Sequence, residues 1–218
     1  MGITRSGDKL LLGFIETTSE NSKAVKGLLK NLLDRNFSFT EGLLCVIDGS
    51  KGLKKAVGET FGKYCLIQRC QWHKRENVLS YLSDKDASVF RARVQSVYRE
   101  PKYESAKARL MEIKNDLLKI NRTAANSLQE GLEHRLGLSA KLGRSLSTTN
   151  CIENVNSKLA SYLRKIKHWK SPDMLARWIA LGLIEIESRI RRINNHKKLY
   201  LLREAIKTEL KLEQKKVA

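Results

Sequence analysis

Residues 43–47 form a short run of apolar side chains, Leu-Leu-Cys-Val-Ile, which ends at Asp48 and Gly49. A run of this length without polar alternation is typical of a strand that is buried on both faces of a sheet. Ser50 is suited to cap a helix directly after it. The apolar face of that helix would consist of Leu53, Val57 and Phe61. A buried strand followed at once by an amphipathic helix predicts an α/β sheet with helical crossovers.

The rest of the first third of the chain continues this alternation of strands and helices. Two strands, Met1–Arg5 and Lys9–Thr17, are predicted on either side of a tight turn at residues 6–8 (Ser-Gly-Asp). A helix capped within residues 18–22 follows. Its apolar face would consist of Val25, Leu28, Leu29, Leu32 and Leu33. Residues 64–68 predict one more short strand, so the first third is expected to form a mixed α/β unit.

After Lys74 the pattern is helical only. Apolar residues recur at helical spacing as far as about Gly143, as in the series Ala106, Leu110, Ile113 and Leu117. Residues 150–168 predict an amphipathic helix. Pro172 is placed to start another helix, which ends near Asn194, because proline is favoured at a first helical position. A last Lys-rich helix is expected to run to the end of the chain.

Basic charge increases along the chain. The 218 residues carry a net charge of +19. Residues 1–60 have 9 Lys and Arg against 7 Asp and Glu, whereas residues 140–218 have 18 against 7. Such an excess suits a polyanionic partner, since each phosphate that is neutralised releases condensed counterions. Nucleic acid is therefore the expected partner, and a Lys-rich helical surface that is merely solvated is the alternative.

The cysteines and the apolar segments indicate a cytosolic protein. Cys45, Cys65, Cys70 and Cys151 lie in or beside apolar runs and are too scattered for a disulfide scaffold. No stretch approaches the ~18 uninterrupted apolar residues that a membrane span needs. The apolar part of the N-terminus is short and runs into Glu16, unlike a signal peptide. No membrane association is expected.

Asp48 is a candidate ligand for a divalent metal ion. Two-metal phosphoryl transfer uses carboxylates from different elements to hold two ions roughly 4 Å apart. Asp48 follows an apolar strand, and the carboxyl ends of strands are where α/β sheets place ligands. The alternative is that Asp48 and Gly49 form only a turn, and the local sequence alone favours that interpretation.

Glu153 is the second candidate carboxylate, and it also has a local explanation. Asn150 and Glu153 match a capping box, in which Asn150 caps the helix and Glu153 binds back to it. Arg164 and Lys167 follow 11 and 14 residues later, which places both within about 40° of Glu153 on a continuous helix. This face would carry a metal site at its start and phosphodiester contacts farther along.

Cys70 and His73 have the spacing Cys-x-x-His, which suggests zinc. A structural zinc site needs four ligands, and no second pair at zinc spacing is visible, although Cys65 and Cys151 remain as possible contributors. His73 would otherwise be a structural histidine at the start of a helix, or a residue close to the scissile phosphate.

Four segments together resemble the catalytic domain of Mutator-type transposases of bacterial insertion sequences, which are DDE enzymes. These segments are DGSKGLKKAV, QRCQWHK-x-x-NV, TTN-x-IE-x-x-N and ARWIALGLIEIE-x-x-x-RRI. The resemblance implies a ribonuclease H-like mixed sheet, N-terminally truncated, with an all-helical insertion and C-terminal helices. It implies three parts: residues 1–73 as the truncated core, 74–147 as the insertion, and 148–218 as the glutamate-bearing helix and basic helices that complete the core.

The resemblance also implies roles for individual residues. Asp48 matches the second aspartate of the acidic triad and Glu153 its glutamate, so these two are expected to bind Mg²⁺ or Mn²⁺. Cys70 and His73 match the Cys-x-x-His signature and join them as catalytic candidates. The candidate DNA contacts are Arg144, Arg164, Lys165 and Lys167. The implied activity is Mg²⁺-dependent cleavage and strand transfer at element ends, in the bacterial or archaeal cytosol near the nucleoid. The expected partners are double-stranded DNA and another transposase chain, as a homo-oligomer or with the full-length enzyme.

The resemblance places the first aspartate of the triad on a strand upstream of Met1. Asp8 cannot replace it, because Asp8 lies in the predicted hairpin turn. We therefore expect this chain alone to have negligible strand-transfer activity. The alternative function is a non-catalytic DNA-binding fragment that regulates transposition. A basic RNA-binding protein is less consistent with the sequence, because Trp72, Trp169 and Trp178 fall mostly at helical or core spacing.

Overall fold

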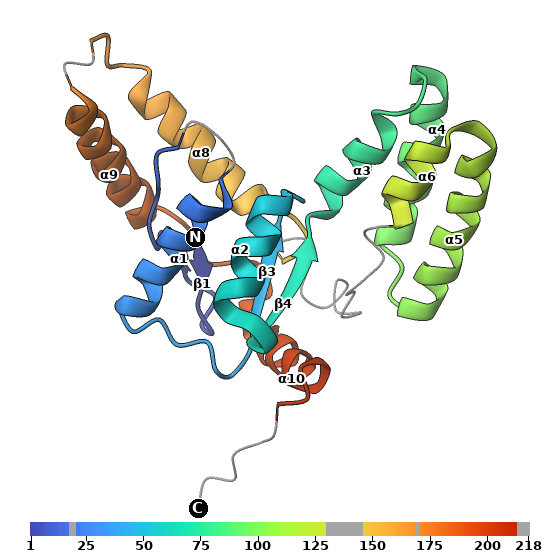
Figure 1. Ribbon diagram of the computed structural model, residues 1–218, viewed down its shortest axis with the longest axis horizontal. Helices are drawn as coiled ribbons and strands as arrows, with labels where there is room; N and C mark the ends of the chain where they lie inside the picture. The colour runs from blue at the N-terminus through green and yellow to red at the C-terminus, as the bar shows by residue number, and fades with distance from the viewer. Residues whose placement is uncertain (18–20, 130–145, 169–170, 213–218) are drawn as a thin grey trace, which may run out of the picture.

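The computed structural model describes residues 1–17, 21–129, 146–168 and 171–212. The protein is a mixed α/β structure in which helices predominate and the sheets are small. Figure 1 shows helices α3–α6 as a separate group on the right, joined to the rest at the end of strand β4, and helices α8 and α9 side by side at the upper left. In the described part of the chain, none of the helices combines the length and the apolar character needed to cross a bilayer.

Strands β3 (Leu43–Ile47) and β4 (Cys65–Arg69) form a parallel pair connected by helix α2 (Lys51–Phe61). The predicted cap is confirmed, since Ser50 Oγ accepts a hydrogen bond from Leu53 N at 3.3 Å. The strand predicted at residues 64–68 is observed one residue later, as β4, because Gly62–Tyr64 form a short 3-10 helix before it. Helix α1 (Ser22–Asp34), capped by Asn21, packs on α2.

The first hairpin is present, but its strands are much shorter than predicted. Strand β1 is Gly2–Ile3 and strand β2 is Lys9–Leu10. Within the described residues these strands form a sheet of their own and do not join β3, so the expected single sheet is wrong. The backbone after Leu10 binds side chains instead of a strand. Leu11 N donates to Glu187 Oε1 at 2.5 Å, and Leu12 O accepts from Arg35 Nη2 at 2.5 Å.

Helices α3–α6 form a cluster with its own apolar core. Their bounds are Gln71–Leu79, Asp84–Tyr98, Tyr103–Ile120 and Arg122–Gln129. The core side chains are Val78, Leu79, Phe90, Val94, Val97, Ala106, Leu110, Ile113, Leu117, Ala124, Ala125 and Leu128. The helix-only pattern predicted after Lys74 is therefore observed as far as the structure describes it, to residue 129. The limits of the predicted insertion, 74 and 147, stay a prediction.

Helices α8 (Asn150–Leu163) and α9 (Pro172–Ser188) form a helical hairpin. Gly182 lies at their contact, where an added Cβ would be 2.9 Å from Leu159 Cδ1. The predicted proline start of α9 is confirmed, with Ser171 as the cap. Helix α8 ends five residues before the predicted end at 168, because the chain must reverse direction after Leu163 for α9 to pack on α8.

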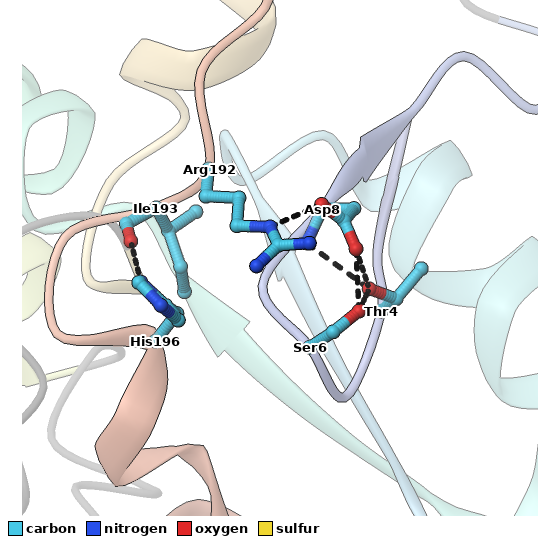
Figure 2. A network of polar contacts seen from close by, with 6 residues as sticks. All are labelled: Thr4, Ser6, Asp8, Arg192, Ile193 and His196. Atoms are coloured by element: carbon cyan, nitrogen blue, oxygen red, sulfur yellow. Dashed lines mark hydrogen bonds and ion pairs between the residues drawn. The ribbon is translucent and has the colours of Figure 1, made fainter.

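The segment after α9 holds the hairpin turn rather than continuing the helix to Asn194 as predicted. Ile193 N donates to Gly7 O at 3.0 Å, and Arg192 Nε donates to Asp8 Oδ1 at 2.6 Å. Figure 2 shows the Asp8 carboxylate between Arg192 and the hydroxyl groups of Thr4 and Ser6. Asp8 therefore lies in the turn, as the sequence predicted, and serves to dock the hairpin.

Helix α10 (Leu199–Glu209) is the last described element and follows a 3-10 turn at His196–Lys198. It packs against the segment that leads into β3, where an added Cβ at Gly42 would lie 2.5 Å from Ile206 Cγ2. Glu41 in this segment binds both Arg5 and Arg203. The hairpin, the approach to β3 and the C-terminal helix are thereby held together.

Candidate active site

Asp48 is an exposed carboxylate at the carboxyl end of β3. Its Oδ1 accepts a hydrogen bond from Ser50 N at 3.0 Å, which makes it part of the turn that starts α2. Gly49 has a φ of +114°, and an added Cβ there would overlap Arg69 Nε. Only glycine fits this close approach. The turn is thus real, and it fixes one carboxylate oxygen while the side chain stays open to solvent.

Cys70 lies at the same edge of the parallel pair. Ile47 and Arg69 are register partners, so Asp48 and Cys70 are the residues that leave the two strands together. Cys70 N donates to Ile47 O at 2.6 Å, and the Cys70 side chain is completely buried at the start of α3. The strand ends place these two predicted residues side by side at the sheet edge, as expected for parallel strands.

The segment before α8 runs along this edge. Leu146 O accepts from Gln68 Nε2 at 2.8 Å, and Ser147 O accepts from Gln71 N at 2.9 Å. These two contacts join positions that are almost 80 residues apart in the chain. They place the start of α8 beside the start of α3, which is how Glu153 reaches the strand ends.

Thr149 connects three of the predicted site residues. Its Oγ1 donates to Glu153 Oε1 at 2.6 Å and lies 3.2 Å from His73 Nδ1 and 3.3 Å from Cys70 Sγ. Thr149 N also donates to Cys70 Sγ at 3.3 Å. Glu153 Oε1 lies 3.6 Å from His73 Nδ1, with 42% of the Glu153 side chain and 34% of the His73 side chain exposed. Cys70, His73 and Glu153 therefore form one cluster around a hydroxyl group that the sequence interpretation did not single out.

The capping box predicted for Glu153 is not formed. The cap of α8 is Thr149, and Asn150 is the first residue of the helix. In a capping box the glutamate accepts from the N–H of the cap residue, whereas the Thr149 N–H goes to Cys70. Glu153 lies in the first turn, where the helix dipole favours a negative charge. Its carboxylate is thus positioned by the hydroxyl of its own helix cap, Thr149, and faces His73 of helix α3.

The metal expectations stay predictions, and the donor atoms present can be compared with what each metal needs. Within the described ranges, no group of three or more His, Cys, Asp or Glu side chains is arranged to hold a metal ion. A four-ligand zinc site around Cys70 and His73 is thus not formed there, and Cys70 is engaged by Thr149. Asp48 and Glu153 each have one oxygen engaged by a neighbouring donor, so a second oxygen remains on each. Magnesium takes one or two carboxylates together with substrate phosphate, and this donor chemistry fits it.

The candidate DNA contacts lie at the far end of α8. Arg164 is the C-terminal cap of the helix, and its Nη2 donates to Ser161 Oγ at 3.1 Å. Lys165 and Lys167 follow in the turn after the helix, and all three are exposed. Lys167 is therefore not on the helical face of Glu153, and that prediction was wrong because α8 is shorter than expected. Arg144 lies outside the described residues.

Thr149 is the functional candidate that sequence reasoning missed. A hydroxyl residue four positions before a glutamate, at a helix start, is the signal that was available. That signal is weak alone, because Thr at such a position is usually a cap. Here Thr149 makes no side-chain cap bond, which frees its hydroxyl for Glu153.

The fold and site describe a mostly helical α/β protein with two carboxylates near a sheet edge and a basic C-terminal part. The family model described as "Transposase, Mutator family" matches residues 1–191, so the chain belongs to the Mutator family of transposases. The family predicted from the sequence motifs is confirmed.

Individual relatives agree with this assignment. The transposase for insertion sequence element IS256 in transposon Tn4001 from Staphylococcus aureus is 27% identical over 192 residues, which cover 85% of this chain and 48% of that protein. The transposase for insertion sequence element IS905 from Lactococcus lactis subsp. lactis is 25% identical over 181 residues, covering 82% and 46%. The transposase for element ISRM3 from Rhizobium meliloti is 25% identical over 187 residues, covering 84% and 46%. The chain spans about half the length of these curated relatives.

Proposed function

We propose that this chain provides part of the DNA-cleaving and strand-joining site of an insertion-sequence transposase. The observation that carries the proposal is the position of Glu153. Contacts from Thr149 to Cys70 and His73 hold its helix at the edge of the sheet where Asp48 leaves β3. Family membership supports DNA as the substrate, since the relatives are named as transposases.

We assign the sheet and its surrounding helices to a ribonuclease H-like core. The parallel pair β3–β4, its crossover helix α2 and the return of α8 to the carboxyl edge support this assignment. The α3–α6 cluster interrupts the core between β4 and α8, as an insertion does. In this arrangement the acidic residues come from elements far apart in sequence, which is what a two-metal site requires.

Asp48 and Glu153 are the residues that would hold Mg²⁺ or Mn²⁺ together with the DNA phosphates. The bound ion supplies Lewis acidity at the phosphoryl group and neutralises charge there. The protein orients the two carboxylates. Ser50 N fixes one oxygen of Asp48, and the Thr149 hydroxyl fixes one oxygen of Glu153. Both carboxylates are therefore oriented in advance and lose little conformational entropy when a metal ion binds.

The metal site is tested by replacing Mg²⁺ with Fe²⁺ and adding ascorbate and hydrogen peroxide, so that radicals cut the protein backbone beside the bound ion. The expected cuts lie near residue 48 and near residues 149–153, and excess Mg²⁺ suppresses them. Asp48→Asn removes both sets, because one ion site uses both carboxylates. The matched control is Asp34→Asn, an exposed aspartate at the end of α1, which leaves the pattern unchanged.

Cuts that persist at both segments in Asp48→Asn would overturn the assignment of Asp48. Where the parent protein, alone or together with a full-length transposase chain, supports Mg²⁺-dependent cleavage of element-end DNA, the same variant is expected to abolish that cleavage while DNA affinity stays close to that of the parent protein. Loss of cleavage together with an equal loss of DNA affinity would instead favour a non-catalytic DNA-binding role for this chain.

DNA contact by the turn after α8 is tested by the double variant Arg164→Gln/Lys167→Gln. Removing one phosphate interaction is expected to reduce the slope of log K against log salt by roughly 1, so the slope for the double variant should fall by about 2. The control is Lys85→Gln/Lys102→Gln, which removes the same charge from exposed positions on the α3–α6 cluster. Equal slopes for the two double variants would remove Arg164 and Lys167 from the interface.

A further inference from the structure

One hydroxyl group has three polar neighbours at the centre of the candidate site. Thr149 Oγ1 lies 2.6 Å from Glu153 Oε1, 3.2 Å from His73 Nδ1 and 3.3 Å from Cys70 Sγ. A hydroxyl has one hydrogen to donate and two lone pairs that accept. The three contacts are satisfied together only if one of them receives the Thr149 hydrogen and the other two groups donate to Oγ1.

The Thr149 hydrogen belongs to Glu153. The carboxylate is the charged acceptor, and its contact with Oγ1 is the shortest of the three, as charge-assisted bonds are. Thr149 Oγ1 could donate to either Glu153 or Cys70 Sγ, but its single hydrogen cannot serve both. With that hydrogen on Glu153, the 3.3 Å contact with Cys70 requires the Cys70 S–H to donate to Oγ1, while Sγ accepts the Thr149 backbone N–H. The contact with His73 then requires a hydrogen on Nδ1.

The position of Glu153 supports the same arrangement at His73. Glu153 Oε1 lies 3.6 Å from Nδ1, so a negative charge faces this nitrogen from the side of α8. A hydrogen on Nδ1 is favoured by both oxygens. In neutral imidazole the other nitrogen is then an acceptor, so His73 would present Nε2 with a free lone pair. The His73 side chain is one-third exposed, which leaves it accessible from solvent.

We infer that Thr149 is a positioning residue of the acidic site, which fixes the Glu153 carboxylate and holds His73 with its hydrogen on Nδ1. This inference rests on the proposed function for the role of Glu153 as a metal ligand. Outer partners of metal ligands typically change metal affinity or activity by about 10–100-fold when they are removed. Cys70 contributes from the buried side, since it receives the Thr149 N–H and limits where the hydroxyl lies.

The test compares Thr149→Val with Thr149→Ser in the whole chain. Valine keeps the β-branched shape and removes the hydroxyl, whereas serine keeps the hydroxyl. Thr149→Val is expected to weaken Mn²⁺ binding, followed by electron paramagnetic resonance, by about 10-fold or more. Thr149→Ser is expected to stay within about 2-fold of the parent protein. Thr123→Val, at an exposed position of α6, is the control for a Thr-to-Val change away from the site.

A second measurement reports on His73 without metal or DNA. Nitrogen-15 chemical shifts of the His73 ring, recorded where the ring is neutral, distinguish a hydrogen on Nδ1 from one on Nε2. The parent protein and Thr149→Ser are expected to show Nδ1–H, and Thr149→Val is expected to shift toward Nε2–H. Equal melting temperatures of the valine and serine variants exclude unfolding as the cause of a difference.

The outcomes separate the inference from the proposed function. Unchanged His73 shifts and unchanged Mn²⁺ affinity in Thr149→Val would overturn the positioning role. If the His73 shifts change as expected but the parent protein shows no Fe²⁺-dependent cuts near Glu153, the hydrogen-bond assignment stands and the metal-site proposal fails.

Discussion

The α3–α6 cluster and the β3–β4 region are held together by different forces. In the cluster, a continuous set of apolar side chains from four helices is almost completely buried. In the sheet, Ile47 and Leu66 are buried, and the remaining residues of β3 and β4 are only half-buried. The cluster gains most of its stability from apolar burial, which scales with the area removed from water.

Polar contacts between distant segments account for more of the organisation around the sheet. Gln68 and Gln71 bind the segment before α8, Thr149 binds Cys70, and Asp8 binds Arg192. Each such bond contributes only about 0.5–1.5 kcal/mol net, so the region that carries the candidate site is expected to open more easily than the cluster. That difference is consistent with the proposed function, in which the site admits DNA.

The largest effect is expected from a change in the cluster core. Leu117→Ala removes a side chain that is 0% exposed and leaves a cavity, which costs about 2–5 kcal/mol of unfolding free energy. Leu118→Ala is the matched control, because Leu118 is the next residue of α5 and is 44% exposed. Denaturant unfolding followed by circular dichroism measures both. A loss in Leu117→Ala no larger than that in the control would contradict the burial of this core.

In the region around the sheets, the corresponding destabilising change is expected where the β1–β2 hairpin turn packs on the segment after α9. Gly7 has a φ of +88°, and an added Cβ would overlap His196 Cβ. Gly7→Ala is therefore expected to cost about 1–3 kcal/mol, from backbone strain and from loss of the fit. Gly27→Ala in α1, where a new Cβ has open space, should instead stabilise by about 0.5–1 kcal/mol. Hydrogen exchange should show the Gly7→Ala effect in β1–β2 and residues 189–198, with the amides of α3–α6 unchanged.

The elements that were predicted correctly depend on local patterns. Three predicted features depend only on residues close together in the chain, and all three are observed: the Ser50 cap, the apolar face of α5 and the proline start of α9. The strand at residues 43–47 is observed as well. The expectation that it is buried on both faces of a sheet was wrong for most of its residues, because strand pairing and coverage depend on partners that the local sequence does not specify.

The candidate site was predicted as a set of residues but not as a geometry. Cys70, His73 and Glu153 lie together, and their catalytic roles remain predictions. The role of Thr149 could not be predicted from the local sequence, because it depends on contacts with residues more than 70 positions away. The end of α8 was misplaced because it is set by the packing of α9, which local periodicity does not report.

A smaller effect is expected from pH at the docked hairpin. The Ser6 hydroxyl and then the Arg192 guanidinium hold the pKa of Asp8 below its ordinary value of 3.8. Because the folded pKa is the lower one, the ionised form contributes stability above 3.8, and this contribution is lost as pH falls through the folded pKa. The melting temperature of the parent protein should therefore fall more steeply below about pH 4 than that of Asp8→Asn. Parallel curves would contradict the ion pair, and Asp34→Asn should follow the parent.

The smallest effect is expected in the reactivity of two cysteine thiols on the half-buried face of the β3–β4 sheet. The Cys45 thiol hydrogen-bonds to Cys65, and this bond lowers the pKa of Cys65. The same bond and burial raise the pKa of Cys45. Since the thiolate is the reactive form, Cys65 should be alkylated by iodoacetamide at lower pH than Cys45. Cys70 is completely buried and should react slowly because the reagent cannot reach its sulfur.

Mass spectrometry of the tryptic peptides separates the two thiols, because Lys51 and Lys63 lie between them. Cys45→Ala removes the donor, so the onset of Cys65 alkylation should move to higher pH. An onset that does not move would mean that Cys65 reactivity follows exposure alone. If Cys70 reacted as early as Cys65, the strand ends beside the candidate site would open as readily as the half-buried face of the sheet. A slow reaction of Cys70 would instead mean that, within the sheet region, the strand ends that contact Thr149 open least often.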